Sequence, residues 1–332
     1  MKWFGAITIV LSVAAGPLSF GVLNPASAES PMQLTVGENA ISISAGRQVL
    51  LHYRYRNVPF KPYVRQLFSP GGVNVLLDAP ADHLHHHGLM LAVTVDGVNF
   101  WTEHQSAGHQ AHRSLAHTSV DDYEEMPRAS FTQHIDWLNL HPQRLLLKET
   151  RRIEICRVKD LEVTLLTWQS RFELPPGKKS ATVTGAHYHG LGMRFLKSMD
   201  AVGQFRNADQ KIGEIVRGDE RLVQSTWCAY SANTNGRTIT VAMFDHPGNP
   251  RRPATWFTMA KPFAYLSATL NLHREPLKVT ADNPLVLTYA VALWDSHVEA
   301  DRINRLYQGW RSRPAFVTAR VNTKRRNESG NY

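Results

Sequence analysis

The sequence predicts an all-β fold, a large antiparallel β-sandwich with one C-terminal helix. Short runs rich in β-branched and aromatic residues recur along the chain, and clusters of Pro, Gly and Asn at 175–177, 233–236 and 247–250 separate them. No helical pattern alternates with these runs, as an α/β fold would require. About 300 residues follow an N-terminal leader, a length that fits one large sandwich or two smaller domains.

The expected strands follow one another along the chain. Residues 40–44 alternate apolar and polar side chains, and 47–55 continue toward a turn at 57–59. Residues 89–95 and 98–101 flank Asp96-Gly97, a dipeptide that favours a tight hairpin turn. Further strands are expected at 73–77, 130–137, 144–158, 162–172, 181–191, 238–244, 255–258, 277–280 and 285–293. Asp295-Ser296 can cap a helix over 297–310, where apolar side chains recur near the 3.6-residue period.

Both ends of the chain are predicted to lie outside the sandwich. Residues 3–23 are almost wholly apolar, and Ala26-Ser27-Ala28 has the small-residue pattern that signal peptidase cuts. We therefore expect a signal peptide over 1–28, a single sandwich domain over 29–315 and a disordered basic tail over 316–332. A retained anchor is the alternative, but Gly16-Pro17 interrupts the apolar run. The mature protein is expected in the periplasm or outside the cell, without a transmembrane span.

Composition narrows the expected partners. Without Lys2, 36 of the 37 basic side chains remain against 28 acidic ones, a formal charge of 36 − 28 = +8. These basic residues are scattered, with no basic helix or aromatic-basic RNA signature, so nucleic acid is not an expected partner. Cys156 and Cys228 lie 72 residues apart, which is not a metal-site spacing. They form either one disulfide in an oxidising compartment or two buried thiols. The oligomeric state stays open.

Histidines crowd one part of the chain. Ten of the sixteen lie between positions 83 and 141, and four of these fall within residues 83–87. Imidazole titrates near neutrality, transfers protons and ligates transition metals, so the crowding indicates a chemical site. If the strand at 89–95 begins a few residues earlier, its alternation sends His83, His85 and His87 to one face and His86 to the other. A solvated surface loop is the passive alternative.

A second histidine pair allows either a metal site or a metal-free one. His187-Tyr188-His189 repeats the His-x-His arrangement about 100 residues later. Facing pairs would make a nitrogen-rich site for zinc, copper or a similar ion, with His83, His85, His187 and His189 as ligands. Without metal, clustered imidazoles disfavour one another's protonation and supply neutral bases. The cofactor is therefore open between a divalent metal and none.

Other polar residues have both an active and a passive interpretation. Glu103 follows Phe100-Trp101-Thr102 and is either a general base or a solvated carboxylate at a hairpin end. Asp245 and His246 pair a carboxylate with an imidazole at a turn, where Asp also commonly acts as a cap. A polar stretch without a period is expected to be a surface loop; it contains His104, His109, His112 and His117.

Several motifs together resemble a known family. They are Lys61-Pro62-Tyr63 with residues 69–74, then residues 82–89, 96–103, 188–195 and 244–253. In order and spacing they resemble the exported "methane oxygenase PmoA" family over about residues 45–295. The resemblance implies a β-sandwich similar to the galactose-mutarotase-like supersandwich and a genomic setting among secreted sugar-degrading enzymes. It does not imply methane oxidation, because the subunit that lends its name is an integral membrane protein, and no segment after residue 23 has 18 consecutive apolar residues.

The resemblance also marks individual positions. Residues that match the family pattern are His83, His85, His86, Glu103, Tyr188, Asp245 and His246. The pattern usually has Pro at Leu84 and often His at Arg252, and it usually has Arg where this chain has His87. That last departure removes a permanent cation, which a protonated imidazole can replace.

The leading functional hypothesis is a secreted carbohydrate-active enzyme, a lyase or glycoside hydrolase, acting on an oligosaccharide, a uronate or a keto-sugar. Elimination beside a carbonyl needs a base, for which His85 and His189 are candidates, and an acid, for which Tyr188 and His86 are candidates. Arg194 or a metal would stabilise the developing enolate. Hydrolysis through Glu103 and Asp245 as a carboxylate pair is the nearby variant.

Two other classes of function are open. The first is a non-catalytic protein that binds a glycan or a metal. The second is a copper oxygenase, as the family label suggests. Against the second, the predicted mature chain begins at Glu29, so it lacks the N-terminal histidine that secreted polysaccharide oxygenases use to bind copper.

Overall fold

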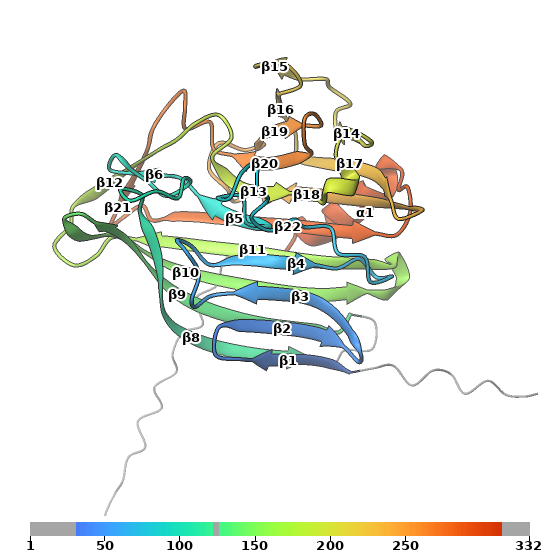
Figure 1. Ribbon diagram of the computed structural model, residues 1–332, viewed down its shortest axis with the longest axis horizontal. Helices are drawn as coiled ribbons and strands as arrows, with labels where there is room; N and C mark the ends of the chain where they lie inside the picture. The colour runs from blue at the N-terminus through green and yellow to red at the C-terminus, as the bar shows by residue number, and fades with distance from the viewer. Residues whose placement is uncertain (1–30, 122–125, 314–332) are drawn as a thin grey trace, which may run out of the picture. The chain divides into compact units, whose positions relative to one another are not determined.

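Three antiparallel sheets form the part of the chain that the computed structural model describes, residues 31–121 and 126–313 (Figure 1). The predicted signal peptide and basic tail lie outside these residues. The ten-stranded sheet has the order β1 (Met32–Val36), β2 (Ala40–Ala45), β3 (Gln48–Arg54), β4 (Tyr63–Leu67), β5 (Leu89–Ala92), β13 (Gly190–Arg194), β20 (Tyr265–Thr269), β19 (Thr255–Met259), β16 (Arg221–Gln224) and β15 (Glu214–Ile215).

The second large sheet has eight strands. Their order is β14 (Gln204–Asn207), β17 (Trp227–Thr234), β18 (Arg237–Asp245), β22 (Leu285–Trp294), β11 (Val163–Glu173), β10 (Gln143–Val158), β9 (Arg128–Leu140) and β8 (His109–Asp121). A four-stranded sheet has the order β21 (Leu277–Thr280), β12 (Ser180–Thr184), β6 (Thr94–Val95) and β7 (Val98–Asn99). The all-β prediction is confirmed.

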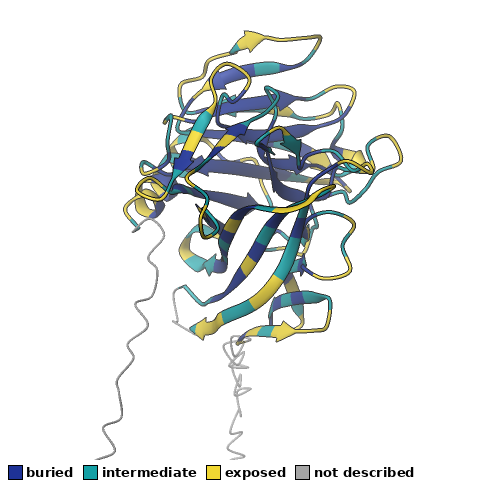
Figure 2. Cartoon of the chain, turned by 90° about the vertical axis from the view of Figure 1, so that its left-hand side faces the viewer, coloured by how far each residue is buried: buried dark blue, intermediate teal, exposed yellow. Residues whose placement is uncertain are grey.

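Apolar side chains along β22 alternate between two cores. Val291 and Leu293 belong to the core between the two large sheets, which is the core of a sandwich. Ala290 and Ala292 belong to a second core, which helix α1 (Ala300–Arg311) covers with Ile303 and three other buried side chains. The long central strands are buried, whereas outer strands and loops are largely exposed (Figure 2). Burial on both faces explains why this strand is apolar almost throughout.

Helix α1 begins later than predicted and has a different cap. It follows Glu299, which makes no side-chain cap hydrogen bond, whereas the sequence predicted capping by Asp295-Ser296. Asp295 instead accepts hydrogen bonds from Ser69 Oγ and the Gly71 amide. Two short 3₁₀ helices, Lys159–Leu161 and Lys197–Met199, complete the described helices. Over residues 31–121 and 126–313, no helix has the length and apolar character to span a bilayer.

Several strand predictions hold and others are wrong. The Asp96-Gly97 turn joins β6 to β7, and Gly97 adopts a positive φ of 83°. Residues 73–77 make isolated bridges rather than a strand, and a turn divides 181–191 into β12 and β13. The polar stretch predicted as loop is largely strand β8, which contains His109, His112 and His117. Because β8 lies at the sheet edge, its side chains need not be apolar.

The two cysteines are buried free thiols. Cys156 belongs to the core beneath α1, whereas Cys228 belongs to the core between the sheets. Burial raises the pKa of both thiols, that of Cys156 to about 11. Of the two possibilities that the sequence left open, the structure therefore shows the buried thiols.

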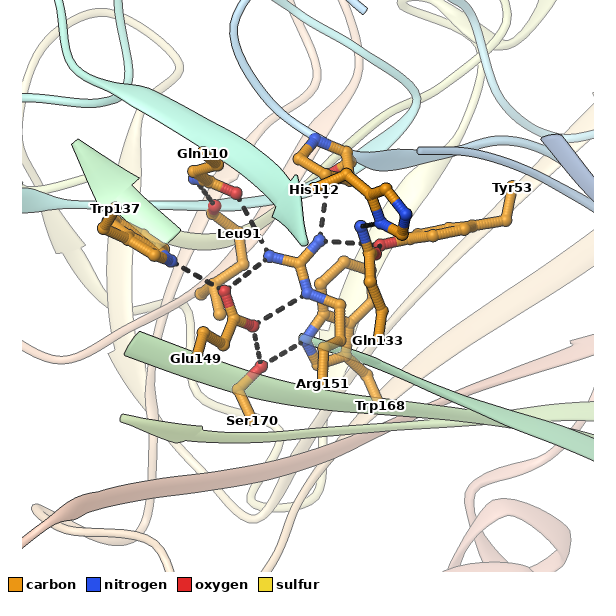
Figure 3. Close-up of polar contacts among 11 residues, drawn as sticks. Tyr53, Leu91, Gln110, His112, Gln133, Trp137, Glu149, Arg151, Trp168 and Ser170 are labelled. Carbon is orange, nitrogen blue, oxygen red and sulfur yellow. Dashed lines mark hydrogen bonds and ion pairs between the residues drawn. The ribbon is translucent and has the colours of Figure 1, made fainter. Parts of the chain in front are cut away.

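A buried polar network crosses the interior of the sandwich (Figure 3). Arg151 on β10 uses all five N–H donors: two bonds go to Glu149 and one each to Tyr53 Oη, Gln110 Oε1 and the Pro62 carbonyl. Glu149 also accepts hydrogen bonds from Trp137 Nε1 (2.8 Å) and Ser170 Oγ (2.6 Å). The network therefore connects β10 to β3, to β8 and to the chain just before β4.

Candidate active site

The candidate site is built on the outer face of the ten-stranded sheet. Along β13, Leu191 and Met193 enter the core, so Gly192 and Arg194 face the other way. A Cβ at Gly192 would lie 2.0 Å from the hydroxyl of Tyr265 on β20. Glycine at this position therefore allows the tyrosine to lie across β13 and form the floor of the site.

The histidine-rich loop is a series of turns and not the start of a strand. The His83 amide donates to the Pro80 carbonyl and the His86 amide to the His83 carbonyl, both at 2.9 Å. Strand β5 begins afterwards, at Leu89. The predicted alternation of His83, His85 and His87 against His86 is therefore wrong. Instead, His83 stacks on His86, with ring centroids 4.6 Å apart and planes at 14°.

His85 and His86 are neutral in this environment. Burial, followed by the positive charge of Lys61, lowers the pKa of His85 to about 4. Burial and the neighbouring histidines lower the pKa of His86 to about 2. His86 Nδ1 is buried and has no hydrogen-bond partner in the described part of the chain, whereas His85 is partly exposed. Both imidazoles therefore have a free lone pair at neutral pH, and the same lowered pKa values make them weaker bases than a solvent-exposed histidine.

Trp101 joins the second histidine motif to the first. The His189 ring stacks on Trp101, with centroids 4.9 Å apart and planes at 11°, and the Tyr188 ring meets its edge at 5.2 Å. His86 approaches the same indole at 6.2 Å. Burial, followed by the charges of His187 and His85, lowers the pKa of His189 to about 3. We call His85, His86 and His189 the imidazole cluster.

Arg194 provides a cation beside the imidazole cluster. Its guanidinium lies 3.6 Å from the centroid of the Phe263 ring, which also contacts His86 at 5.7 Å. Nη2 is 3.4 Å from Asp82 Oδ2 and 3.7 Å from Asp200 Oδ2. Nε and Nη1 are buried without a hydrogen-bond partner among the described residues. The cation is thus only partly compensated at this site.

Glu103 is part of a buried chain of alternating charges. Its Oε1 lies 2.5 Å from Lys61 Nζ and 3.0 Å from His87 Nε2, although the second contact lacks the direction of a hydrogen bond. His87 Nδ1 lies 2.8 Å from Asp78 Oδ1, and Tyr63 Oη donates to the other oxygen of Asp78. The sequence indicated neither Lys61 nor Asp78 as a site residue.

This charge chain fixes the protonation of its members. Burial opposes ionisation of Glu103, but the close contact with His87 and the charge of Lys61 outweigh it and lower its pKa. Burial likewise opposes the imidazolium of His87, but its contacts with Asp78 and Glu103 raise its pKa. The raised pKa favours the imidazolium form of His87, which places a positive charge between the two carboxylates. Glu103 is therefore neither a solvated hairpin carboxylate nor a free base.

The predicted metal site does not form. Among residues 31–121 and 126–313, no three His, Cys, Asp or Glu side chains are grouped to hold a metal ion. His83 Nδ1 lies 3.1 Å from Asp82, and His187 Nε2 lies 3.3 Å from Glu220. Because His83 and His85 lie on turns, and His187 and His189 lie in or beside another turn, the two pairs do not present their nitrogens as adjacent strands would.

Asp245 and His246 have structural partners apart from the imidazole cluster. The Asp245 carboxylate accepts from Asn249 Nδ2 (2.7 Å) and the Ala254 amide (2.8 Å), and burial raises its pKa to about 6. His246 Nδ1 accepts from the Gly248 amide, and its Nε2 donates to the Arg313 carbonyl. No described contact of either residue reaches Glu103 or the imidazole cluster. The two carboxylates of the predicted Glu103–Asp245 pair thus have separate partners, Lys61 for Glu103 and Asn249 for Asp245, and the pair stays a prediction.

Comparison with known proteins gives a family and distant structural likenesses. An α-galactosidase from Lactobacillus brevis matches 83% of this chain at 7% identity and a TM-score of 0.43, and this chain spans 41% of its length. A protein named as a putative aldose 1-epimerase from Klebsiella pneumoniae subsp. pneumoniae matches 84% of this chain and 85% of its own, at 9% identity and a TM-score of 0.41. No curated protein matches the sequence. Residues 40–308 match the family of unknown function DUF6807, and the chain belongs to that family.

Proposed function

We propose that this protein is a secreted carbohydrate-active enzyme that transfers protons at the imidazole cluster. The observation that carries the proposal is the gathering of three neutral imidazoles, Tyr188 and Arg194 on one face of the sheet. Neutral bases beside a protonated tyrosine and an incompletely compensated cation suit the removal of a ring proton next to a carbonyl. A uronate or keto-sugar unit of an oligosaccharide provides such a proton.

Exposure distinguishes the residues that meet substrate from those that support them. His85 and Tyr188 are partly exposed, whereas His86 and His189 are buried. We therefore assign His85 as the base and Tyr188, whose pKa burial raises, as the acid. The C–H electron pair moves toward the carbonyl as the proton passes to His85. The enolate then expels the leaving oxygen, which takes the Tyr188 proton. Arg194 is buried, so its positive charge stabilises the intermediate through its field and not by contact.

The test is turnover of uronate-containing and keto-sugar glycans by the untagged protein, followed by the ultraviolet absorbance of unsaturated products and by mass spectrometry. His85→Ala and Tyr188→Phe should each lower the rate by about 10²-fold or more. His104→Ala is the matched control, because His104 is an exposed loop histidine outside the cluster. Absence of any product from this panel, with and without added zinc or copper, would sink the proposal.

The same experiment distinguishes the enzyme from the alternative, a non-catalytic glycan-binding protein. Binding of a glycan, detected as a rise in melting temperature without product, would favour that alternative. Export belongs to the proposal as well, because the expected signal peptide at 1–28 lies outside the described residues. The narrower resemblance to exported proteins that carry the methane oxygenase PmoA name stays a prediction.

A further inference from the structure

A groove opens between the end of β3 and the start of β8, beside the Lys61–Glu103 pair, whose charges also act on His85 of the imidazole cluster. It has a volume of about 310 Å³ and is lined by residues 55–58, Phe60 and residues 109–113. Phe60 directly precedes Lys61, and the charges of Glu103 and Lys61 act on the pKa of His109 in the groove wall. We call this feature the β3–β8 groove. It is a neighbour of the Lys61–Glu103 pair and shares no lining residue with the imidazole cluster.

The buried network sets which nitrogen of His112 carries the proton (Figure 3). Arg151 Nη1 donates to Tyr53 Oη, and Tyr53 in turn donates to Gln133 Oε1. The amide nitrogen of Gln133 is therefore left to donate to His112 Nδ1, 3.1 Å away. An imidazole whose Nδ1 accepts a hydrogen bond carries its proton on Nε2 when neutral. Burial, followed by the charge of Arg56, lowers the pKa of His112 and keeps it neutral.

The Nε2–H of His112 is thus a donor of fixed position in the wall of the groove. No described residue accepts from it. The wall also contains two cationic donors, Arg56 and Arg113. Arg113 is paired at 3.0 Å with Asp136, which lies outside the lining. Arg56 lies 5.9 Å from the centroid of the Tyr55 ring. None of the lining residues is acidic, so the groove favours an anionic ligand.

Apolar groups lie beside these donors. Phe60 is half-buried and packs on His109 with ring centroids 4.4 Å apart, and Val58 lines the same groove. A small pocket with an apolar wall and a few placed donors suits one ring-sized ligand, and this volume lies at the lower end of the usual range for ligand sites. A pyranose with a carboxylate combines the apolar ring face and the negative charge that the wall requires.

We propose that the β3–β8 groove is an accessory subsite for a carboxylate-bearing sugar residue of the glycan that reaches the imidazole cluster. This inference rests on the proposed function and narrows its substrate class to polyuronates. Arg56 holds the carboxylate, His112 Nε2–H donates to a ring substituent, and Phe60 packs on the ring. The groove binds and positions the glycan, while proton transfer takes place at the imidazole cluster.

The experiment compares oligogalacturonate with the same oligosaccharide after methyl esterification, which removes the charges and keeps the sugar backbone. Calorimetry at low salt gives the affinity of each, and imidazole ¹⁵N chemical shifts report on His112. We expect the acid to bind about tenfold more tightly than the ester and Arg56→Gln to abolish that difference. Arg47→Gln, the same charge change at an exposed residue outside the groove, should preserve it.

Each outcome decides the subsite separately from catalysis. Equal affinity for acid and ester, or equal losses in Arg56→Gln and Arg47→Gln, overturns the subsite. A failure of any oligouronate to bind also overturns it, whereas turnover of a keto-sugar that depends on His85 would leave the proposed function standing. Conversely, oligouronate binding that depends on Arg56, without turnover of any glycan, supports the subsite and counts against the catalytic proposal.

Discussion

Replacing Arg151 by Ala should destabilise the sandwich more than any surface substitution. The guanidinium is fully buried and is the cationic partner of Glu149, with Nε 2.8 Å from Oε1 and Nη2 2.8 Å from Oε2. Truncation leaves the Glu149 carboxylate buried without its countercharge. It also removes the donor to the Pro62 carbonyl and to Gln110 Oε1.

The expected cost follows from that burial. Removing one partner of a buried ion pair costs about 3–5 kcal/mol, because the other charge remains desolvated. For a domain of this size, 1 kcal/mol corresponds to about 2–4 °C, so the melting temperature should fall by roughly 6–20 °C. Replacing both charges, as in Glu149→Leu with Arg151→Met, should not restore full stability, because Trp137 Nε1 and Ser170 Oγ would then lose their acceptor.

Thermal unfolding followed by circular dichroism or calorimetry measures this effect. Arg152→Ala is the matched control, because the neighbouring Arg152 side chain is 40% exposed and its ion pair with Glu154 should contribute less than about 1 kcal/mol. If Arg151→Ala lowered the melting temperature no more than Arg152→Ala, the reasoning would fail. Full stability in the Glu149→Leu/Arg151→Met double variant would show that the neutral donors find other partners.

The remaining predictions concern the charge chain, the site floor and the thiols. The pKa of His87 is raised in the folded protein, so protonation of His87 stabilises the fold. This stabilisation is complete below about pH 6.5, the unfolded pKa, and is lost as the pH rises through the folded pKa. His87→Gln should therefore lower the melting temperature more at about pH 6 than at about pH 9. Gly192→Ala should displace Tyr265 and cost about 1–3 kcal/mol, measured by denaturant unfolding. Cys156 and Cys228 should resist a thiol reagent in the folded protein, and both should react after unfolding.

Each of these predictions has a contrary outcome. A His87→Gln difference that grew with pH would mean that the folded pKa of His87 is depressed. Gly309→Ala serves as the glycine control, because a Cβ on this helical residue contacts nothing and should stabilise the protein by about 0.5–1 kcal/mol. Equal effects at Gly192 and Gly309 would contradict the close contact with Tyr265. Fewer than two thiols after unfolding without reductant would indicate a disulfide.

The sequence predicted the central strands well and the edge strands poorly, for a physical reason. Strand β22 is buried on both faces, so its apolar run is unmistakable, and Asp96-Gly97 has few conformational alternatives to a hairpin turn. Strand β8 pairs on one side only, so polar and charged side chains are tolerated along it. Strand β8 is stabilised by its pairing with β9, and a long-range pairing of this kind cannot be predicted from local composition.

For the site, residue types were predictable and their geometry was not. The motifs indicated His85, His86, Tyr188 and His189; the last three gather around the Trp101 indole, and His85 contacts His86. The alternation assumed for 83–87 failed because the segment is bounded by Pro80 and by Gly88, which has a φ of 40°. Those two residues were signals for a turn.

The partners that fix protonation were harder to find than the histidines. Lys61 lies 42 residues before Glu103, and β4, which follows Lys61, pairs with β5 in the folded structure, so the contact is long-range. Glu149 and Arg151 could have been found from the sequence, because on the alternating pattern of β10 they lie on the same face as the buried Ile153 and Ile155. Charged residues at core positions of a strand predict a buried pair.

The buried pair links the core of the sandwich to both proposed sites. Arg151 donates to the carbonyl of Pro62, the residue between Lys61 and Tyr63. In the charge chain, Lys61 contacts Glu103 and Tyr63 contacts Asp78. Through Tyr53 and Gln133, the same guanidinium orients the imidazole in the β3–β8 groove. An apolar pair at these positions would leave Trp137 Nε1 and Ser170 Oγ without their acceptor, and it would orient neither the charge chain nor the groove imidazole. The charged pair at the centre of the sandwich therefore serves both the stability of the core and the orientation of these residues.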